Sequence, residues 1–371
     1  LYHLIFVVKI KINMRVCILG NGLTSLALSK ALVNQNINVD LFIKKKRTKL
    51  DPHRTIGISK SNVDFFNNNI IDIDKIIWKL NKIEIFTDNL KEDKLINFED
   101  NSNELFSVVK NFQLIDVLEK SLSKKKTFKK KYKKINSNLI KDYDLIINTD
   151  ASNFINKKYF HRKMIKEHNS FAYTTIINHE KIQNDSAIQI FTKKGPLAFL
   201  PISQSETSIV FSIHNSNFKK DEKVEELIHQ YNFRYKIKKI KKITSFELKS
   251  LILRSYYHNN ILAFGDLIHR IHPLAGQGFN MTIRDIKILL RIIKTRHDLG
   301  LSLDSSVNHE FEKKIRHNNF IFSNGIDVIH EFFSFERKID TDILSKAVHQ
   351  IGKNYFINKF FKKIADRGII L

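Results

Sequence analysis

Residues 261–280 read ILAFGDLIHRIHPLAGQGFN, and this stretch decides the fold of the 371-residue chain. Its first four residues are an apolar run typical of a buried strand, and a carboxylate, Asp266, follows shortly after. Pro273, Gly276 and Gly278 then predict a turn that brings backbone amides close to a ligand at the start of a helix. The stretch therefore predicts a strand, a ligand-binding turn and a helix, in that order.

A second glycine turn lies near the start of the chain. Residues 14–43 predict a strand, a tight turn at Gly20 and Gly22, a helix and a second strand, which together form a βαβ unit. Ser25 occupies the position of the third glycine in a G-x-G-x-x-G turn, where a small side chain still permits close packing of helix on strand. Ile43 stands where an acidic residue that binds ribose is expected. This turn indicates a nucleotide pyrophosphate but does not distinguish FAD from NAD.

The remaining chain alternates between helical and strand patterns. Residues 108–122 predict an amphipathic helix and residues 143–149 a buried strand. Residues 165–250 turn to alternating strands, and residues 305–365 are mostly helical in pattern. This order predicts a nucleotide-binding domain that is interrupted by a separate β layer.

The formal net charge is +25, from 63 basic and 38 acidic residues. The densest basic run, Lys124 to Lys134, has three readings: a nucleic-acid surface, a solvated face, or, together with Lys236 to Lys242, contact with anionic lipid headgroups. The lysines are spread along the whole chain, so we do not expect a nucleic-acid partner.

The single cysteine, Cys17, argues against a disulfide framework and lies in an apolar strand pattern. Residues 1–13 precede Met14 and are expected to be an extension without function. Their apolar stretch is too short for a transmembrane helix.

Residues 261–280 resemble the G-D-x-x-H-x-x-x-P-x-x-G-Q-G-x-N motif of the flavoprotein monooxygenases related to p-hydroxybenzoate hydroxylase. Three further segments are similar to the ubiquinone-biosynthesis branch of these enzymes, the UbiH/UbiF/VisC type. They are residues 108–118, residues 187–201 with their Gly-Pro-Leu-Ala-x-Leu-Pro end, and Arg54, which matches an arginine near the flavin.

The resemblance implies an α/β fold in which a Rossmann-like, p-hydroxybenzoate hydroxylase-like FAD-binding domain carries an inserted β-sheet substrate domain and C-terminal helices. Its implied divisions are an FAD-binding domain over residues 14–75, 100–164 and 255–330, a substrate domain over 76–99 and 165–254, and a C-terminal helical segment over 331–371.

The resemblance also implies the cofactor, FAD, and a set of residues that bind it. In the family the aspartate that corresponds to Asp266 holds the ribityl chain, and the segment that matches residues 273–280 lines the isoalloxazine ring. The complete expected set is Gly20, Gly22, Ser25, Arg54, Asp150, Gly265, Asp266, His269, Pro273, Gly276, Gln277, Gly278 and Asn280. No side chain is assigned as a catalytic acid or base.

The chain departs from the family at the loop that begins with Asp150. The family has Asp-Gly there, with an arginine nearby, whereas this chain has Asp150 and Ala151, with Lys157 in the place of the arginine. That loop touches FAD and has been assigned to the pyrophosphate of NAD(P)H, so the source of electrons, NAD(P)H or a separate protein, stays open. His269 and His272 are spaced like a metal pair, but no cluster of ligand side chains accompanies them, and no metal is expected.

The implied activity is hydroxylation of the aromatic ring of a polyprenylated phenol in ubiquinone biosynthesis, through a flavin hydroperoxide formed with O2. The implied setting is the cytoplasm, with peripheral contact to the inner face of a membrane and association with a ubiquinone-biosynthesis complex. Two alternatives are a flavin-dependent isoprenoid reductase or dehydrogenase and a non-catalytic subunit of a quinone-biosynthesis assembly. The second is motivated by Ser25, Ile43 and Ala151.

Overall fold

The structure is a computed structural model that describes residues 14–44, 50–88, 94–99, 104–133, 140–218, 222–272, 276–338, 346, 348–350 and 354–368. The expected extension at residues 1–13 and the predicted site residue Pro273 lie outside the described residues.

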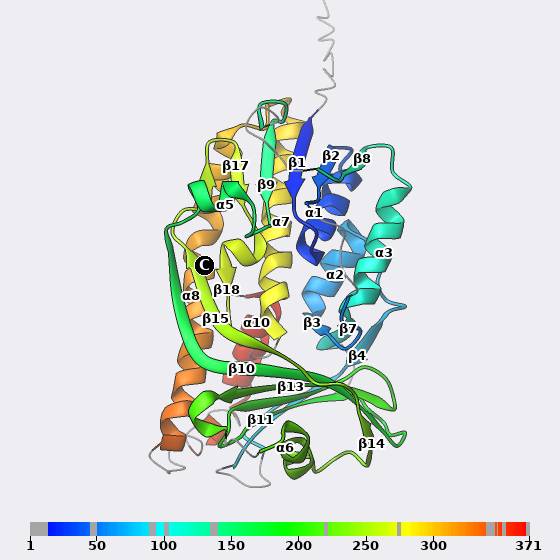
Figure 1. Ribbon diagram of the computed structural model, residues 1–371, viewed down its shortest axis with the longest axis vertical. Coiled ribbons are helices and arrows are strands. Elements are labelled where there is room, and N and C mark those ends of the chain that lie inside the picture. Colours follow the sequence, from blue (N-terminus) through cyan, green and yellow to red (C-terminus); the bar gives the residue numbers. More distant parts are fainter. Residues whose placement is uncertain are drawn as a thin grey trace, which may run out of the picture.

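A six-stranded sheet forms the centre of the nucleotide-binding part (Figure 1). Its order is β16 (Tyr257–His258), β17 (Ile261–Ala263), β9 (Leu145–Asn148), β1 (Arg15–Leu19), β2 (Asn38–Phe42) and β8 (Phe128–Lys131). All neighbouring pairs are parallel except β16 with β17. Parallel strands need crossover connections, and the helix between β1 and β2 supplies the first, as the βαβ pattern predicts.

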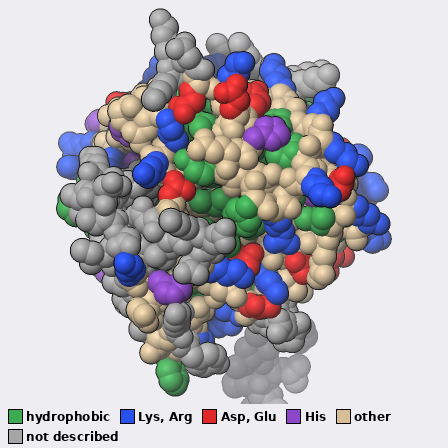
Figure 2. All heavy atoms as spheres, turned by 90° about the horizontal axis from the view of Figure 1, so that it is seen from below, with side chains coloured by type: hydrophobic (Ala, Val, Ile, Leu, Met, Phe, Trp, Pro, Cys, Tyr) green, Lys and Arg blue, Asp and Glu red, His purple; other side chains and the backbone are tan. Residues whose placement is uncertain are grey.

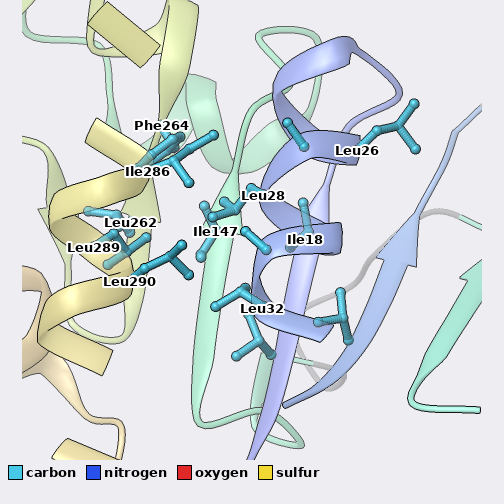
Figure 3. Packing of buried hydrophobic residues seen from close by; sticks show 14 of the residues in the cluster. Ile18, Leu26, Leu28, Leu32, Ile147, Leu262, Phe264, Ile286, Leu289 and Leu290 are labelled. Carbon is cyan, nitrogen blue, oxygen red and sulfur yellow. The ribbon is translucent and has the colours of Figure 1, made fainter. Parts of the chain in front are cut away.

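Two helices, α1 (Leu23–Asn34) and α7 (Gln277–Asp298), pack against this sheet and against each other. Leu28 of α1 and Leu290 of α7 lie on either side of Ile147 in β9 (Figure 3). The helix α3 (Asn111–Ser123) packs beside α1. It begins three residues later than the pattern at 108–122 predicts, because Val108 and Val109 belong to a strand.

A nine-stranded sheet lies across the bottom of the molecule in Figure 1. Its strands run in the order β18 (His269–Arg270), β15 (Thr244–Leu253), β10 (Lys163–His179), β13 (Glu206–His214), β12 (Pro196–Pro201), β11 (Ser186–Phe191), β5 (Lys82–Thr87) and β6 (Ile96–Glu99), with β14 (Ile237–Ile240) paired to β10. One face is covered by α6 (Val224–Tyr231), whose apolar side chains join the core of this sheet.

A three-stranded sheet, with β7 (Phe106–Lys110) between β3 (Thr55–Ser59) and β4 (Ile77–Leu80), lies between the two larger sheets and precedes α3. The helix α2 (Lys60–Asn69) follows β3 directly. Sequence reasoning grouped β4 with the substrate domain and β18 with the FAD-binding domain, whereas β4 pairs with β7 and β18 pairs with β15 of the nine-stranded sheet. Short strands carry no local signal for their partners, so only the tertiary register determines these pairings.

The described residues of the last part of the chain are mainly helical, in agreement with the pattern at 305–365. It contains α8 (Ser305–Lys338) and α10 (Tyr355–Arg367). Phe322 of α8 and Ile364 of α10 pack with Ile271 and Met281 in a small apolar cluster. A short helix, α5 (Phe154–Tyr159), follows the loop at Asp150.

Candidate flavin and substrate site

The first glycine turn joins β1 to α1 and lies against the end of β9. Gly20 has a φ of 142°, and a Cβ at this position would lie 2.1 Å from Oγ1 of Thr149. Thr149 is fixed there because its Oγ1 donates to the carbonyl of Leu19 at 2.8 Å. Position 20 therefore requires glycine both for its backbone conformation and for its space.

The next glycine, Gly22, is the N-cap of α1 and has an ordinary φ of −92°. No neighbouring heavy atom lies within 4 Å of the place that a Cβ would take. The packing of the protein itself therefore does not require glycine at this position. The buried Ser25 fits the third glycine position, since its Oγ donates to the carbonyl of Gly22 at 2.8 Å.

The second glycine segment contacts the first one directly. Gly265 has a φ of 65°, and a Cβ on it would lie 2.8 Å from Cγ2 of Thr24 in the first turn of α1. Asp266 follows Gly265 and is exposed on the side of the cavity described below. Two segments that lie more than two hundred residues apart in the sequence are thus packed into one corner of the molecule.

The helix α7 begins at this corner. Its N-cap, Gly276, has a φ of 63° and lies against Gly57 and the ring of Phe106, each 3.6 Å from the place of a Cβ. Gly278 has no neighbouring heavy atom within 4 Å of that place. The first turn of α7, with its unpaired amide groups and positive end of the helix dipole, therefore faces open space.

Asn280 fastens the start of α7 to β3 and α2. It is fully buried; its Oδ1 accepts from the backbone N–H of Ser59 and from Nδ2 of Asn62, both at 2.9 Å. Its Nδ2 donates to the carbonyls of Gly57 and Gly276, both at 3.1 Å. Asn280 therefore does not lie on the cavity surface. It stabilises the start of α7 from within the core.

Arg54 and Asp150 were both predicted from the resemblance, but only Arg54 lines the cavity. Arg54 is exposed and lines the cavity at the start of β3. The carboxylate of Asp150 turns into its own loop, where it accepts from the backbone N–H of Ser152 at 2.8 Å and from Oγ of Ser152 at 3.1 Å.

The end of β2 offers no carboxylate to a ribose. Ile43 is buried in the main core. The acid of this strand, Asp40, accepts from Nζ of Lys131 at 2.7 Å and from the hydroxyl of Tyr143 at 2.6 Å. Burial by itself would raise the pKa of Asp40, but these hydrogen bonds and the positive charges of Lys131 and Arg15 outweigh it and lower the pKa.

His269 and His272, predicted as a pair only by spacing, have separate contacts. Nε2 of His269 lies 2.5 Å from Oδ2 of Asp285 in α7, and both side chains are buried. Oδ1 of Asp285 accepts from Asn319 in α8 at 3.2 Å. The ring of His272 instead lies edge-on to that of His168, 5.3 Å away. His269 therefore joins the cavity wall to two helices.

One cavity of about 1670 Å³ connects these elements to the nine-stranded sheet. Seven residues of the predicted set line it: Gly22, Arg54, Asp266, His269, Gly276, Gln277 and Gly278. Five others do not line it: Gly20, Ser25, Asp150, Gly265 and Asn280.

The farther part of the cavity is apolar. Its lining includes side chains of β5, β6, β11 and α8, among them Ile83, Ile85, Ile96, Phe98, Phe191, Ile326 and Phe332. Sequence reasoning missed these residues, because each is an ordinary apolar position of a strand or helix. It also missed Thr24, Thr149 and the α10 residues on the rim, for which the sequence carries no local signal.

The space around Gly22 and Gly278 shows whether the site has room for a dinucleotide. A Cβ at Gly22 or Gly278 would meet no neighbouring protein atom, yet both residues line the cavity and both lie at helix N-termini. Glycine at these two places leaves room for a group that approaches the backbone closely, as the pyrophosphate and ring of a flavin dinucleotide do. The residues present therefore fit FAD at both turns, and the end of β2 is the point where an expected contact is missing.

Comparison with known proteins gives first the class. Residues 152–295 match the FAD binding domain family, a range that includes the second glycine segment but not the first. The structure superposes on p-nitrophenol 4-monooxygenase from Pseudomonas putida with a TM-score of 0.75 at 11% identity, over 96% of this chain and 100% of that one. It is also similar to a variant of HpxO from Klebsiella pneumoniae complexed with FAD, with a TM-score of 0.72 at 12% identity, over 95% and 99% of the two chains. The expected fold class, that of the p-hydroxybenzoate hydroxylase-like FAD-dependent monooxygenases, is confirmed.

The sequence relatives include hydroxylases of ubiquinone biosynthesis. The chain is 28% identical over 164 residues to 3-demethoxyubiquinol 3-hydroxylase of Escherichia coli, which is 42% of this chain and 41% of that protein. It is 23% identical over 278 residues to the ubiquinone biosynthesis monooxygenase COQ6 of Schizosaccharomyces pombe, which is 61% and 57% of the two chains. The chain thus spans about half the length of the curated relatives that it matches. The resemblance to the ubiquinone-biosynthesis hydroxylases that the motifs predicted is confirmed by these matches.

The surface charge and the helix lengths can be compared with the expectations of scattered basic residues and of no transmembrane helix. In Figure 2, Lys and Arg side chains are spread around the visible face with acidic side chains between them. Within the described part of the chain, no helix is both long enough and apolar enough to cross a membrane.

Proposed function

We propose that this chain is an FAD-dependent monooxygenase that hydroxylates the aromatic ring of a polyprenylated phenol in ubiquinone biosynthesis. The observation that carries the proposal is the continuity of the cavity, which runs from two glycine turns at helix N-termini to an apolar chamber. Its volume, about 1670 Å³, exceeds the roughly 300–1,000 Å³ of typical small-ligand sites. The cavity therefore has room for a dinucleotide and an apolar substrate together.

The chamber favours an isoprenoid tail over a polar substrate. The side chains of Ile83, Ile85 and Phe98 and their neighbours can bury hydrocarbon at about 0.8 kcal/mol per CH2 group. A phenol head would lie where the chamber meets the first turn of α7. An apolar wall also excludes water from the reacting ring, which protects an activated oxygen species from hydrolysis.

When bound, FAD supplies the redox chemistry, which consists of the uptake of electrons and the activation of O2. The residues of this chain bind and orient it. The turn at Gly22 and the N-terminus of α1 are suited to the pyrophosphate, and Asp266 to the hydroxyl groups of the ribityl chain. The first turn of α7 presents its positive dipole end to the electron-rich ring.

The first experiment is the visible absorption spectrum of the purified protein, followed by release and identification of the bound flavin. We expect FAD in a ratio near one to one. A matched pair of variants tests whether FAD binds at the Gly22 turn. Gly22→Ala puts a methyl group into open cavity space without a clash, so it should fold and lose FAD. The added methyl group of Gly325→Ala also meets no neighbouring atom but lies on the exposed side of α8, so this variant should keep FAD.

Oxygen consumption with a prenylated phenol then tests the reaction. Hydroxylated product with a matching uptake of O2 supports the monooxygenase. Turnover without O2 uptake would favour the isoprenoid reductase, and a chain that does not take up added FAD would favour the non-catalytic subunit. Comparing NADH, NADPH and photochemical reduction identifies the electron source, since turnover only with light would indicate a separate reductase protein.

A further inference from the structure

The helix α10 exposes three large aromatic side chains. Phe356, Phe360 and Phe361 are 78%, 59% and 43% exposed. Phe356 and Phe360 are one helical turn apart and so lie on the same side. The ring of Phe361 lies 6.1 Å from that of Phe360, and Phe361 also lines the cavity. Aromatic side chains gathered on one helix face in this way indicate a surface that another apolar phase covers.

A row of basic side chains borders this aromatic face. Lys359, Lys363 and Arg367 recur at intervals of four residues, are all exposed, and also line the cavity where it meets α10. The acid of this helix, Asp366, is turned inward, where its Oδ1 accepts from the backbone N–H of Ser61 at 2.8 Å. Arg367 also contacts Asp366, at 3.7 Å. The exposed side chains of α10 are therefore mainly aromatic and positively charged.

The inner side of α10 is fastened to the rim of the cavity. The carbonyl of Asp366 accepts from Oγ of Ser59 at 2.8 Å and from Oγ of Ser61 at 2.9 Å. At the middle of the helix, Asn358 donates to the carbonyl of Asn97 at 3.0 Å. Residues 361–367 line the cavity, and Figure 1 shows α10 between the two large sheets. The same helix thus exposes Phe356 and Phe360 to solvent and forms part of the cavity rim.

We propose that α10 docks the protein on an anionic lipid surface, with Phe356 and Phe360 inserted among the headgroups and the basic row against the lipid phosphates. The cavity rim then lies at that surface, so an apolar ligand passes from lipid into the chamber without crossing water. The docking is independent of the reaction, whereas the passage of substrate rests on the proposed function.

The composition of the face favours lipid over a protein partner. Lysine is depleted from the centres of protein–protein interfaces, whereas beside a bilayer its long stem can lie along apolar surface while the ammonium group reaches the headgroups. Phe on one face with Lys and Arg beside it is the composition of helices that lie in the plane of a membrane interface. The net charge of +25 adds attraction to an anionic surface.

The test is cosedimentation of the FAD-loaded full chain with vesicles. We expect binding to phosphatidylcholine vesicles that contain about one quarter phosphatidylglycerol, and loss of most binding with phosphatidylcholine alone or at high salt. The double variants Phe356→Ser with Phe360→Ser, and Lys359→Gln with Lys363→Gln, should each weaken binding about tenfold or more. Phe233→Ser, which changes a 64% exposed phenylalanine just after α6, is the matched control and should bind as the wild type does.

Three outcomes would overturn the proposal: no vesicle binding by the wild type, equal binding of all the variants, or a protein that instead dimerises through this face. The Phe356→Ser, Phe360→Ser variant should keep its FAD and its turnover of a short, water-soluble phenol, because neither side chain lines the cavity. Vesicle binding without any hydroxylation would refute the proposed function and leave the docking intact. Hydroxylation without vesicle binding would do the opposite.

Discussion

The amide of Asn280 should hold the flavin-side end of α7 in place. We expect Asn280→Ala to destabilise the fold and to weaken FAD binding, although Asn280 is not on the cavity surface. The substitution removes the acceptor for Ser59 N–H and for the Asn62 amide, and both of these donors are buried. The carbonyls of Gly57 and Gly276 lose a donor, which costs less because carbonyl oxygens tolerate a missing partner better than N–H groups do.

The expected loss of stability follows from the two buried donors, Ser59 N–H and Asn62 Nδ2, that lose the Asn280 oxygen as their acceptor. Each buried donor left without a partner costs about 1–3 kcal/mol, and Asn62 retains contacts to Oγ of Ser59 at 3.0 Å and to the backbone carbonyl of residue 280 at 3.5 Å. The small cavity left by the missing amide adds to this, so we expect a loss of about 3–4 kcal/mol in the free energy of unfolding. Urea unfolding of the FAD-free protein measures the loss, and a titration with FAD measures the weaker binding.

Asn280→Asp is the informative control. It keeps the acceptor oxygen and nearly the same volume, but its second oxygen would face the carbonyls of Gly57 and Gly276, to which the wild-type amide donates. We therefore expect Asn280→Asp to be at least as destabilising as Asn280→Ala. If Asn280→Asp unfolds at the wild-type urea concentration, the amide does not make these hydrogen bonds and the bracing role is refuted.

Three other outcomes can be measured. Gly20→Ala should cost about 2–4 kcal/mol and abolish FAD retention, because its methyl group would overlap Thr149 and its φ is unfavourable for alanine; a flavin-loaded Gly20→Ala protein of normal stability would contradict this. Asp40 has a lowered pKa, so its ionised form contributes stability above the unfolded-state value of about 3.9 and loses it as the pH falls through the lower folded-state pKa; Asp40→Asn should therefore be less stable at pH 7 and lose less stability below about pH 4, as urea midpoints against pH would show. Each isoprene unit added to the phenol should lower KM about fivefold or more until the chamber is full, and a KM that does not depend on tail length would exclude the apolar chamber as the tail site.

The local sequence was sufficient for the elements that carry the nucleotide turns. A buried run, two glycines and a helical pattern specify β1, its turn and α1, and the motif at 261–280 specifies β17 and the start of α7. Family resemblance, rather than periodicity, indicated that both turns serve one ligand. The contact of Gly265 with Thr24 is the physical basis of that convergence.

Contacts between distant segments were not predictable in the same way. The pattern at 305–365 predicts helices, but nothing in it places Asp366 over Ser59 and Ser61, because a docking position depends on the shape of both partners. Asn280 was expected among the residues at the flavin ring, and its buried amide network became visible only when α2, β3 and α7 were assembled. Likewise, Asp150 matches the family motif, but its carboxylate accepts a hydrogen bond from Ser152 in the same loop.

The three departures from the family differ in their consequences for the cofactor. Ser25 replaces a glycine behind the turn and is accommodated by a hydrogen bond to Gly22. Ala151 is exposed in a loop that Asp150 organises, so it leaves the cavity wall unchanged. Ile43 is different, because it lies in the main core, where an introduced carboxylate would lose its hydration without gaining a partner. A ribose-binding acid therefore cannot be restored by a single substitution at this position. FAD affinity in this chain should accordingly depend on the pyrophosphate turn and on the segment from Asp266 to Gly278, which makes the integrity of α7 more important here than in relatives that keep the acid.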